Sequence, residues 1–253
     1  MKAGLVSVTF RSLEPRAVAE LARRCGLSGV EWGGDVHAPH GDLEAARQVL
    51  ELSRAAGLEV AAYGSYYRAG ESESQGLSWA RVLASAQAMQ APLVRVWAGK
   101  RGSQEADAAY FRGVTGDLRR ICQASQTPVA CEFHGGTLCD SGQAALQVLE
   151  AVAHPNLKML WQPANGASIA ARLSDLRAVK PHLANLHVFQ WGPGGGGDKR
   201  SLGEGRAQWQ QYLSEAGQDD ADRWALLEFV RGDEPAQLER DAGTLLSWLA
   251  QQG

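Results

Sequence analysis

The chain has 253 residues, 45% of them hydrophobic, and a formal net charge of -3 at pH 7. This length and apolar content suit one large α/β domain, while the charge and the lack of a Lys/Arg run argue against a nucleic-acid-binding surface. No apolar run reaches the roughly 18 residues of a membrane-spanning helix, and residues 1–10 lack the apolar core and cleavage site of a signal peptide. We therefore expect a cytoplasmic protein with neither a nucleic-acid nor a membrane partner.

Short runs rich in β-branched and aromatic residues alternate along the chain with longer amphipathic segments. The short runs predict strands over residues 2–9, 29–32, 59–63, 93–97, 129–133, 157–162, 183–189 and 224–229. The amphipathic segments predict helices over residues 15–25, 43–56, 77–89, 106–124, 143–152, 169–179, 208–215 and 236–249. Several helices have boundary signals: Ser12 and Asp42 precede two of them, and Gly26, Gly57 and Pro181 follow others.

Eight strand–helix units in succession predict a (β/α)8 TIM barrel that forms a single domain over residues 1–253. A doubly wound open sheet is the alternative, but no GxGxxG motif follows the first strand. In a barrel of this kind the active site lies at the C-terminal ends of the strands and in the loops that follow them. Polar side chains at those positions are therefore the candidates for a functional site.

The four cysteines of the chain are Cys25, Cys122, Cys131 and Cys139. They show no CxxC spacing, so the sequence predicts neither a structural zinc site nor a disulfide framework. Cys131 alternates with Glu132 along a strand, so it should face the helices as a small apolar residue.

Residues 129–136, VACEFHGG, place Glu132 and His134 at the end of an otherwise apolar strand. The period of two along a strand puts both on one face, and an unpaired buried carboxylate costs several kcal/mol. The same alternation predicts an inward-facing polar set of Glu31, Arg95, Glu132, Gln162, His187 and Glu228. Because the layers inside such barrels normally consist of Val, Ile and Leu, this polar set indicates a functional site.

Four of these residues, Glu132, Gln162, His187 and Glu228, end successive strands and can all bind a metal. Their oxygen-rich composition favours Mn²⁺ or Mg²⁺ as the divalent metal ion, with Zn²⁺ or Co²⁺ as alternatives. A metal that holds two adjacent oxygens of a hydroxy-ketone stabilises an enediolate, and two carboxylates can remove and return a proton. The sequence thus predicts isomerisation or epimerisation of a small-molecule carbohydrate.

Structural roles are an alternative for several of these residues. Glu31 and Arg95 form either a buried salt bridge or part of the substrate site. His134 contacts substrate, supports a ligand or packs in the core, while His37 and His40 belong to a loop.

Six segments of the chain resemble the sugar phosphate isomerase/epimerase family of xylose isomerase-like TIM barrels. These segments are GVEWGGDVHAP, VRVWAG, EFHGG, HVFQW, SLGEGRAQW and LLEF. The resemblance implies that Glu132, Gln162, His187 and Glu228 are the metal ligands and that Glu132 and Glu228 are the acid/base pair. The substrate-binding residues we expect are Glu31, Arg95, Trp97, His134, Asn165 and Arg200.

The sequence departs from the family pattern at two positions. The family usually has aspartate where this chain has Gln162, and often where it has Gln190. A glutamine side chain offers an oxygen but no charge, so we expect weaker metal binding. Two other hypotheses therefore stay open: a metal-free, catalytically degenerate carbohydrate-binding barrel, and a metal-dependent sugar or inosose dehydratase.

The segment 191–201, WGPGGGGDKRS, is the other distinctive local feature. Four consecutive glycines followed by Lys199 and Arg200 suggest a flexible linker, with a mobile lid or an anion cradle as the functional alternatives. Aromatic residues follow several strand ends and are suited to wall a sugar pocket. The sequence does not fix the oligomeric state, and a homo-oligomer is one option.

Overall fold

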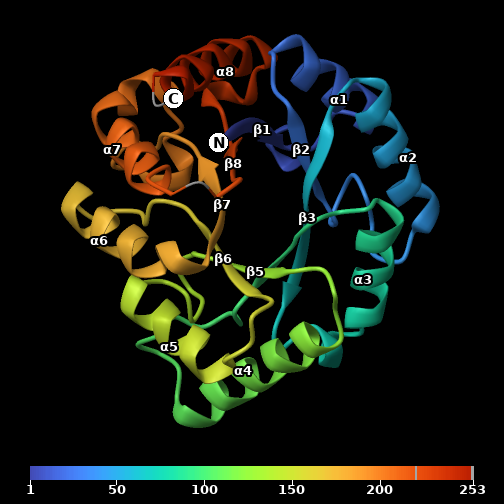
Figure 1. The fold of residues 1–253 in the computed structure, drawn as a ribbon, viewed down its shortest axis with the longest axis vertical. Coiled ribbons are helices and arrows are strands. Elements are labelled where there is room, and N and C mark those ends of the chain that lie inside the picture. Colours follow the sequence, from blue (N-terminus) through green and yellow to red (C-terminus); the bar gives the residue numbers. More distant parts are fainter. Residues whose placement is uncertain (220, 252–253) are drawn as a thin grey trace.

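Eight parallel strands form a closed barrel in the computed structural model, which describes residues 1–219 and 221–251 (Figure 1). The strands are β1 (Lys2–Val6), β2 (Gly29–Gly33), β3 (Glu59–Arg68), β4 (Val94–Trp97), β5 (Val129–Glu132), β6 (Leu157–Trp161), β7 (Leu183–Val188) and β8 (Trp224–Leu227). Each strand pairs with the next, and β8 closes the barrel on β1. The predicted (β/α)8 fold is confirmed.

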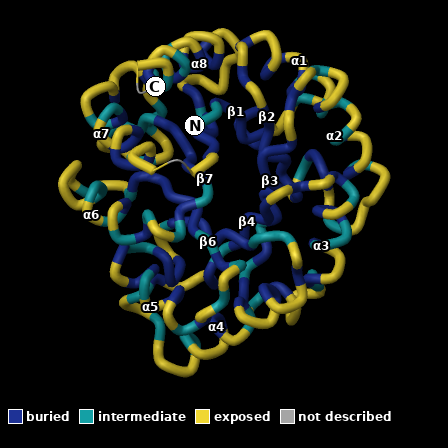
Figure 2. Tube along the Cα trace, viewed as in Figure 1, coloured by how far each residue is buried: buried dark blue, intermediate teal, exposed yellow. Residues whose placement is uncertain are grey.

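A ring of eight α-helices surrounds the strands in the described residues (Figure 1). These are α1 (Pro15–Arg24), α2 (Leu43–Ala55), α3 (Trp79–Ala88), α4 (Ala108–Gln123), α5 (Gly142–Val152), α6 (Ile169–Val179), α7 (Arg206–Ala216) and α8 (Pro235–Ala250). Figure 2 shows the strands buried at the centre and the outer helix surfaces exposed. Over the residues that the structure describes, no helix has the length and apolarity needed to cross a membrane.

Two strands differ in length from the sequence prediction, and one helix lacks the start signal that the sequence suggested. β1 ends at Val6 because the following residues, Ser7–Phe10, form a 3-10 helix, and β3 continues as far as Arg68. Asp42 caps α2 by accepting a hydrogen bond from the backbone of Ala45, as predicted. Ser12 does not cap α1, which begins after Glu14 without a side-chain cap. The other predicted boundaries lie within two residues of the observed ones.

The main hydrophobic core lies between the barrel and the helices. Trp161 packs there against Tyr212 with ring centroids 5.2 Å apart, and Cys131 is fully buried in the same layer, as its alternation with Glu132 predicts. All four cysteines are free, so the predicted lack of disulfides is confirmed. The carboxylates inside the barrel thus face away from this layer.

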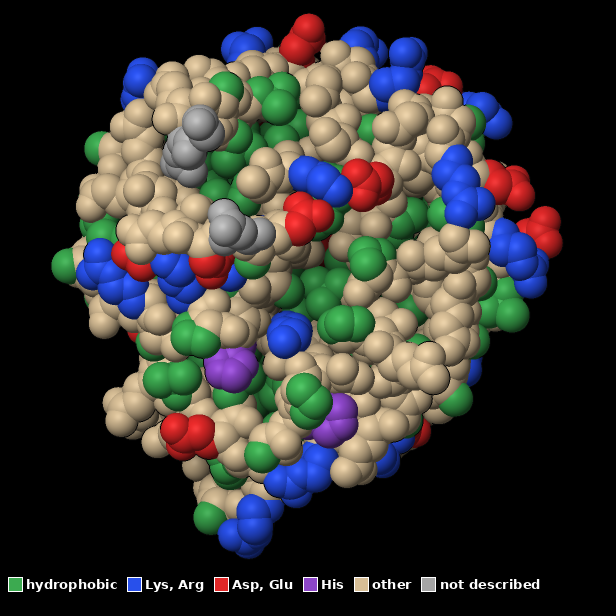
Figure 3. All heavy atoms as spheres, viewed as in Figure 1, with side chains coloured by type: hydrophobic (Ala, Val, Ile, Leu, Met, Phe, Trp, Pro, Cys, Tyr) green, Lys and Arg blue, Asp and Glu red, His purple; other side chains and the backbone are tan. Residues whose placement is uncertain are grey.

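Apolar side chains fill the barrel interior below the strand ends. One cluster contains Val6, Val8, Ala61, Trp224 and Leu226, and the other contains Ala62, Leu93, Ala130 and Leu160. A hollow of about 560 Å³ lies beneath them, where the strands begin. Figure 3 shows hydrophobic side chains around a central hollow, with Lys and Arg scattered among Asp and Glu. The interior is therefore closed below the polar groups at the C-terminal end.

Glycine is needed at the start of β2 because of this packing. A Cβ atom on Gly29 would lie 2.5 Å from a ring carbon of Trp224 and 2.9 Å from the carbonyl oxygen of Glu59. We expect Gly29→Ala to lower the free energy of unfolding by about 1–3 kcal/mol through overpacking. Urea unfolding measures the change.

The matched control is Gly116→Ala on the exposed side of α4, where a Cβ atom meets no other atom within 4 Å. That substitution should raise stability by up to about 1 kcal/mol because alanine favours a helix. Equal stability of the two variants would contradict the conclusion that the packing of Trp224 requires glycine at position 29.

Candidate active site

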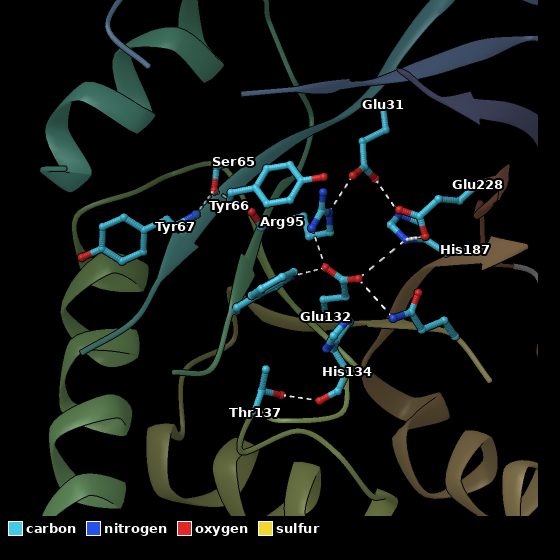
Figure 4. Close-up of polar contacts among 12 residues, drawn as sticks. Glu31, Ser65, Tyr66, Tyr67, Arg95, Glu132, His134, Thr137, His187 and Glu228 are labelled. Atoms are coloured by element: carbon cyan, nitrogen blue, oxygen red, sulfur yellow. Dashed lines mark hydrogen bonds and ion pairs between the residues drawn. The ribbon is translucent and has the colours of Figure 1, made fainter. Parts of the chain in front are cut away.

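Six polar side chains meet inside the C-terminal end of the barrel (Figure 4). They are Glu31 on β2, Arg95 on β4, Glu132 on β5, Gln162 directly after β6, His187 on β7 and Glu228 directly after β8. Each is at most 7% exposed. The period of two along the strands therefore identified which side chains point inward.

Arg95 links two of the carboxylates. Its Nε donates to Glu31 Oε1 over 2.7 Å, and its Nη1 donates to Glu132 Oε2. Burial would raise the pKa of Glu31, but the positive charges of Arg95 and His187 lower it to about 2. Arg95 thus stabilises both carboxylates in their ionised form, and the salt bridge that the sequence allowed for Glu31 and Arg95 is present.

His187 lies between three carboxylates. Its Nε2 is 3.1 Å from Glu31 Oε2, and its Nδ1 is 3.1 Å from Glu228 Oε2 and 4.0 Å from Glu132 Oε1. Burial opposes protonation of the imidazole, but Glu228 and Glu31 raise the pKa of His187 to about 10. The negative field at this point attracts positive charge strongly.

Glu132 accepts hydrogen bonds from three different side chains. Besides Arg95, these are Trp97 through its indole Nε1 and Gln162, whose Nε2 lies 3.1 Å from Glu132 Oε1. Burial would raise the pKa of Glu132, but Arg95 and then His187 lower it. This carboxylate is fixed in position and charge.

A cavity of about 220 Å³ opens beside these groups. It is lined by Arg11, Tyr66, Arg95, Trp97, Glu132, His134, Gln162, Trp191, Glu228 and Phe229. Trp97 and His134 stack with ring centroids 4.9 Å apart, so they form one flat wall. Carboxylates at the base and aromatic faces on the sides suit a small polyhydroxy ligand.

The predicted substrate residues divide into two groups. Arg95, Trp97 and His134 line the cavity, whereas Glu31, Asn165 and Arg200 do not. Glu31 instead lies behind Arg95 and His187, and its contacts there are those of a residue that positions them. Arg200 is 44% exposed and bonds to Asp198, so its side chain is engaged outside the cavity.

Sequence reasoning missed two lining residues, Arg11 and Phe229. Phe229 adopts a left-handed backbone conformation with φ 57°, which is rare for an aromatic residue. Arg11 is placed by the 3-10 helix that ends β1 early. The one available signal was position, because both residues follow strand ends.

The glycine-rich segment 191–201, for which the sequence suggested a flexible linker, is folded back on itself in the structure. Trp191 and Lys199 form an antiparallel bridge, and the backbone nitrogen of Gly192 donates to the carbonyl of Asp198 over 2.8 Å. A Cβ atom on Gly192 would lie 2.1 Å from Asp198 Oδ2, so glycine is required there. This hairpin holds Trp191 against the cavity.

The donor atoms at the site are of the types that a divalent cation binds, but their spacing is not that of a metal site. His187 Nδ1 is buried without a hydrogen-bond partner among the described residues and faces Glu132 and Glu228, while Nε2 contacts Glu31, as in many carboxylate–histidine–metal arrangements. Three carboxylates, the Arg95 guanidinium and a protonated His187 together carry a charge of about -1, and loss of the His187 proton would leave about -2. Within residues 1–219 and 221–251, no three His, Cys, Asp or Glu side chains lie close enough together to hold a metal ion.

Arg95 should be essential for stability. Arg95→Met leaves Glu31 and Glu132 buried without their cation, and breaking such a pair typically costs about 3–5 kcal/mol. Adding Glu31→Gln should restore part of this loss because one unpaired charge is removed. Urea unfolding of the single and double variants checks both expectations.

Lys2→Met serves as the control, since Lys2 pairs with Glu59 over 3.0 Å at the exposed surface. An exposed pair contributes about 0–1 kcal/mol, so this variant should stay near the parent. If Arg95→Met were no more destabilised than Lys2→Met, the buried ion pair would not hold the site together.

Comparisons with known proteins agree with this architecture. The family model described as xylose isomerase-like TIM barrel matches residues 19–252. No curated protein sequence matches the chain.

Among solved structures, the probable 3-DHS dehydratase of Bacillus anthracis superposes with a TM-score of 0.81 at 19% identity, covering 97% of this chain and 99% of that one. D-psicose 3-epimerase from Clostridium cellulolyticum has a TM-score of 0.69 at 14% identity, covering 99% of both chains. The 3-keto-D-glucoside 4-epimerase of E. coli has a TM-score of 0.70 at 14% identity, again covering 99% of both. At these identities the likeness establishes the fold alone. With the family match over most of its length, the chain belongs to the xylose isomerase-like TIM barrel family.

Proposed function

We propose that this protein is an isomerase or epimerase that moves a proton at the carbon next to the carbonyl group of a carbohydrate. The observation that carries the proposal is the pair of carboxylates, Glu132 and Glu228, which line one cavity from two different strands. Both lie within 4.0 Å of the same nitrogen of His187. Two carboxylates this close to one point can remove and return a proton at one substrate carbon.

The residues that would hold a divalent metal ion are Glu132, His187 and Glu228, with Gln162 binding through its amide oxygen. When bound, such an ion polarises a substrate carbonyl as a Lewis acid. Mn²⁺ or Mg²⁺ suits the oxygen-rich donor set best. The high affinity of His187 for a proton means that metal binding there must release that proton, so it should weaken as the pH falls.

The surrounding side chains have distinct tasks in this mechanism. Glu31 accepts from His187 Nε2 and so fixes the ring with Nδ1 toward the cavity. Arg95 and Trp97 both donate to Oε2 of Glu132 and so hold this carboxylate in one orientation, while its Oε1 accepts from Gln162. The stacked wall of Trp97 and His134 packs against the apolar face of a sugar and excludes water from the reacting carbon.

Proton transfer can be followed with solvent deuterium. Incubating the protein with Mn²⁺ and a panel of ketohexoses in D₂O should introduce deuterium at the carbon next to the carbonyl. Glu132→Gln and Glu228→Gln should each lower the rate of this exchange by a factor of ~10² to 10⁴, which is the usual effect of removing a proton-transfer group. Mass spectrometry and NMR of the recovered sugar measure the label.

Glu51→Gln, an exposed carboxylate on α2, is the control and should exchange as fast as the parent. Full exchange in either active-site variant would remove that residue from the mechanism. An unsaturated product would identify a dehydratase, and metal-dependent sugar binding without any exchange would favour a carbohydrate-binding barrel.

Gln162 allows a test of the metal site that does not depend on activity. Gln162→Asp replaces an amide donor to Glu132 with a second carboxylate, so the metal-free variant should be less stable through repulsion. The added charge should tighten Mn²⁺ binding, and saturating Mn²⁺ should raise Tm more than in the parent.

Calorimetric titration of Mn²⁺ and thermal unfolding with and without EDTA give both readouts. Gln162→Asn, which changes the length but not the charge, separates the effect of charge from that of geometry. Equal Mn²⁺ affinity in the parent and Gln162→Asp would mean that residue 162 does not contact the ion.

A further inference from the structure

A second cavity adjoins the one that contains the carboxylates. It measures about 320 Å³ and is lined by Val8, Thr9, Phe10, Arg11, Ser12, Lys199, Phe229 and Asp233. Arg11 and Phe229 line both cavities, so these two side chains form the wall between them. A ligand that extends out of the first cavity past this wall enters the second.

The shared wall is built by unusual backbone geometry. Phe229 directly follows Glu228 and has the left-handed φ of 57°, and its backbone nitrogen donates to Thr9 Oγ1 over 3.2 Å. Lys199 lies 5.3 Å from the centroid of the Phe229 ring. Strained conformations of this kind persist where surrounding contacts hold a side chain in a required place, often at ligand sites. Here the required place is the boundary between the cavities.

The charged groups around the second cavity are already paired. Lys199 Nζ lies 2.6 and 2.8 Å from the two carboxylate oxygens of Asp233, and Arg11 bonds to Asp35 and to the hydroxyl of Tyr66. Neither cation is thus free to neutralise a phosphate. Such pairs instead offer donors and acceptors side by side, which suits the uncharged hydroxyl groups of a sugar, and the Phe229 ring offers an apolar face.

The volumes of the two cavities also favour a ligand that occupies both. Ligand pockets in proteins commonly measure roughly 300–1,000 Å³. The first cavity, at about 220 Å³, is below this range, whereas the two cavities together fall within it. One sugar unit in the first cavity leaves the second available for another.

We propose that the second cavity is a subsite for a further uncharged sugar unit, so that the substrate is a disaccharide or glycoside rather than a free or phosphorylated monosaccharide. This inference rests on the proposed function for the reacting unit in the first cavity. Phe229 packs against the linkage between the units, while Lys199 and Asp233 bind hydroxyl groups of the outer unit.

The test compares ligands that share one reacting unit. D-fructose, the fructose-containing disaccharides lactulose and isomaltulose, and fructose 6-phosphate are titrated calorimetrically into the Mn²⁺-loaded protein, and deuterium exchange is measured alongside. We expect at least one disaccharide to bind ~10-fold more tightly than fructose. The double variant Lys199→Met/Asp233→Asn removes the ion pair of the outer subsite and should bring this ratio close to 1.

Lys2→Met/Glu59→Gln is the matched control, because it removes an exposed ion pair where the strands begin and should preserve the ratio. The subsite is ruled out if neither disaccharide binds more tightly than fructose, if the ratio survives in Lys199→Met/Asp233→Asn, or if fructose 6-phosphate binds best. Exchange on fructose without any disaccharide preference would count against the subsite alone. Disaccharide binding without exchange would support the subsite and count against the proposed proton transfer.

Discussion

The guanidinium of Arg95 is the interaction on which the candidate active site depends. It joins Glu31 on β2 to Glu132 on β5, and through Glu31 it also orders His187 on β7. Three carboxylates could not otherwise share so small a volume away from water. The barrel supplies the positions, and Arg95, together with protonated His187, balances the negative charges.

Simple periodicity predicted much of this arrangement. Alternation along the strands was enough to place Glu132 and His187 inside the barrel, and eight strand–helix units were enough to predict its closure. What periodicity could not give was depth, because it assigns a side chain to a face without saying what lies in front of it. Glu31 was therefore expected at the substrate, whereas it lies behind Arg95.

Local backbone exceptions account for the rest of what was missed. Phe229, one of the two residues that were missed, has a positive φ and lines the cavity, yet an aromatic residue type does not indicate a left-handed conformation. The glycine run at 194–197 suggested a flexible linker, whereas Trp191 and Lys199 on its two sides form a bridge and close a local hairpin. The conformation of Phe229 involves a contact far away in the sequence, because its backbone nitrogen donates to Thr9 Oγ1.

The apolar cluster beneath the polar groups affects how a ligand can reach the cavity. Trp224 and Leu226 close the barrel below the carboxylates, with Gly29 giving the Trp224 ring its space. The cavity lined by Glu132 and Glu228 therefore does not continue through the barrel to the hollow where the strands begin. In the proposed reaction, substrate would therefore enter and product would leave on the C-terminal side of the barrel, and accumulated product would compete with substrate for the same cavity.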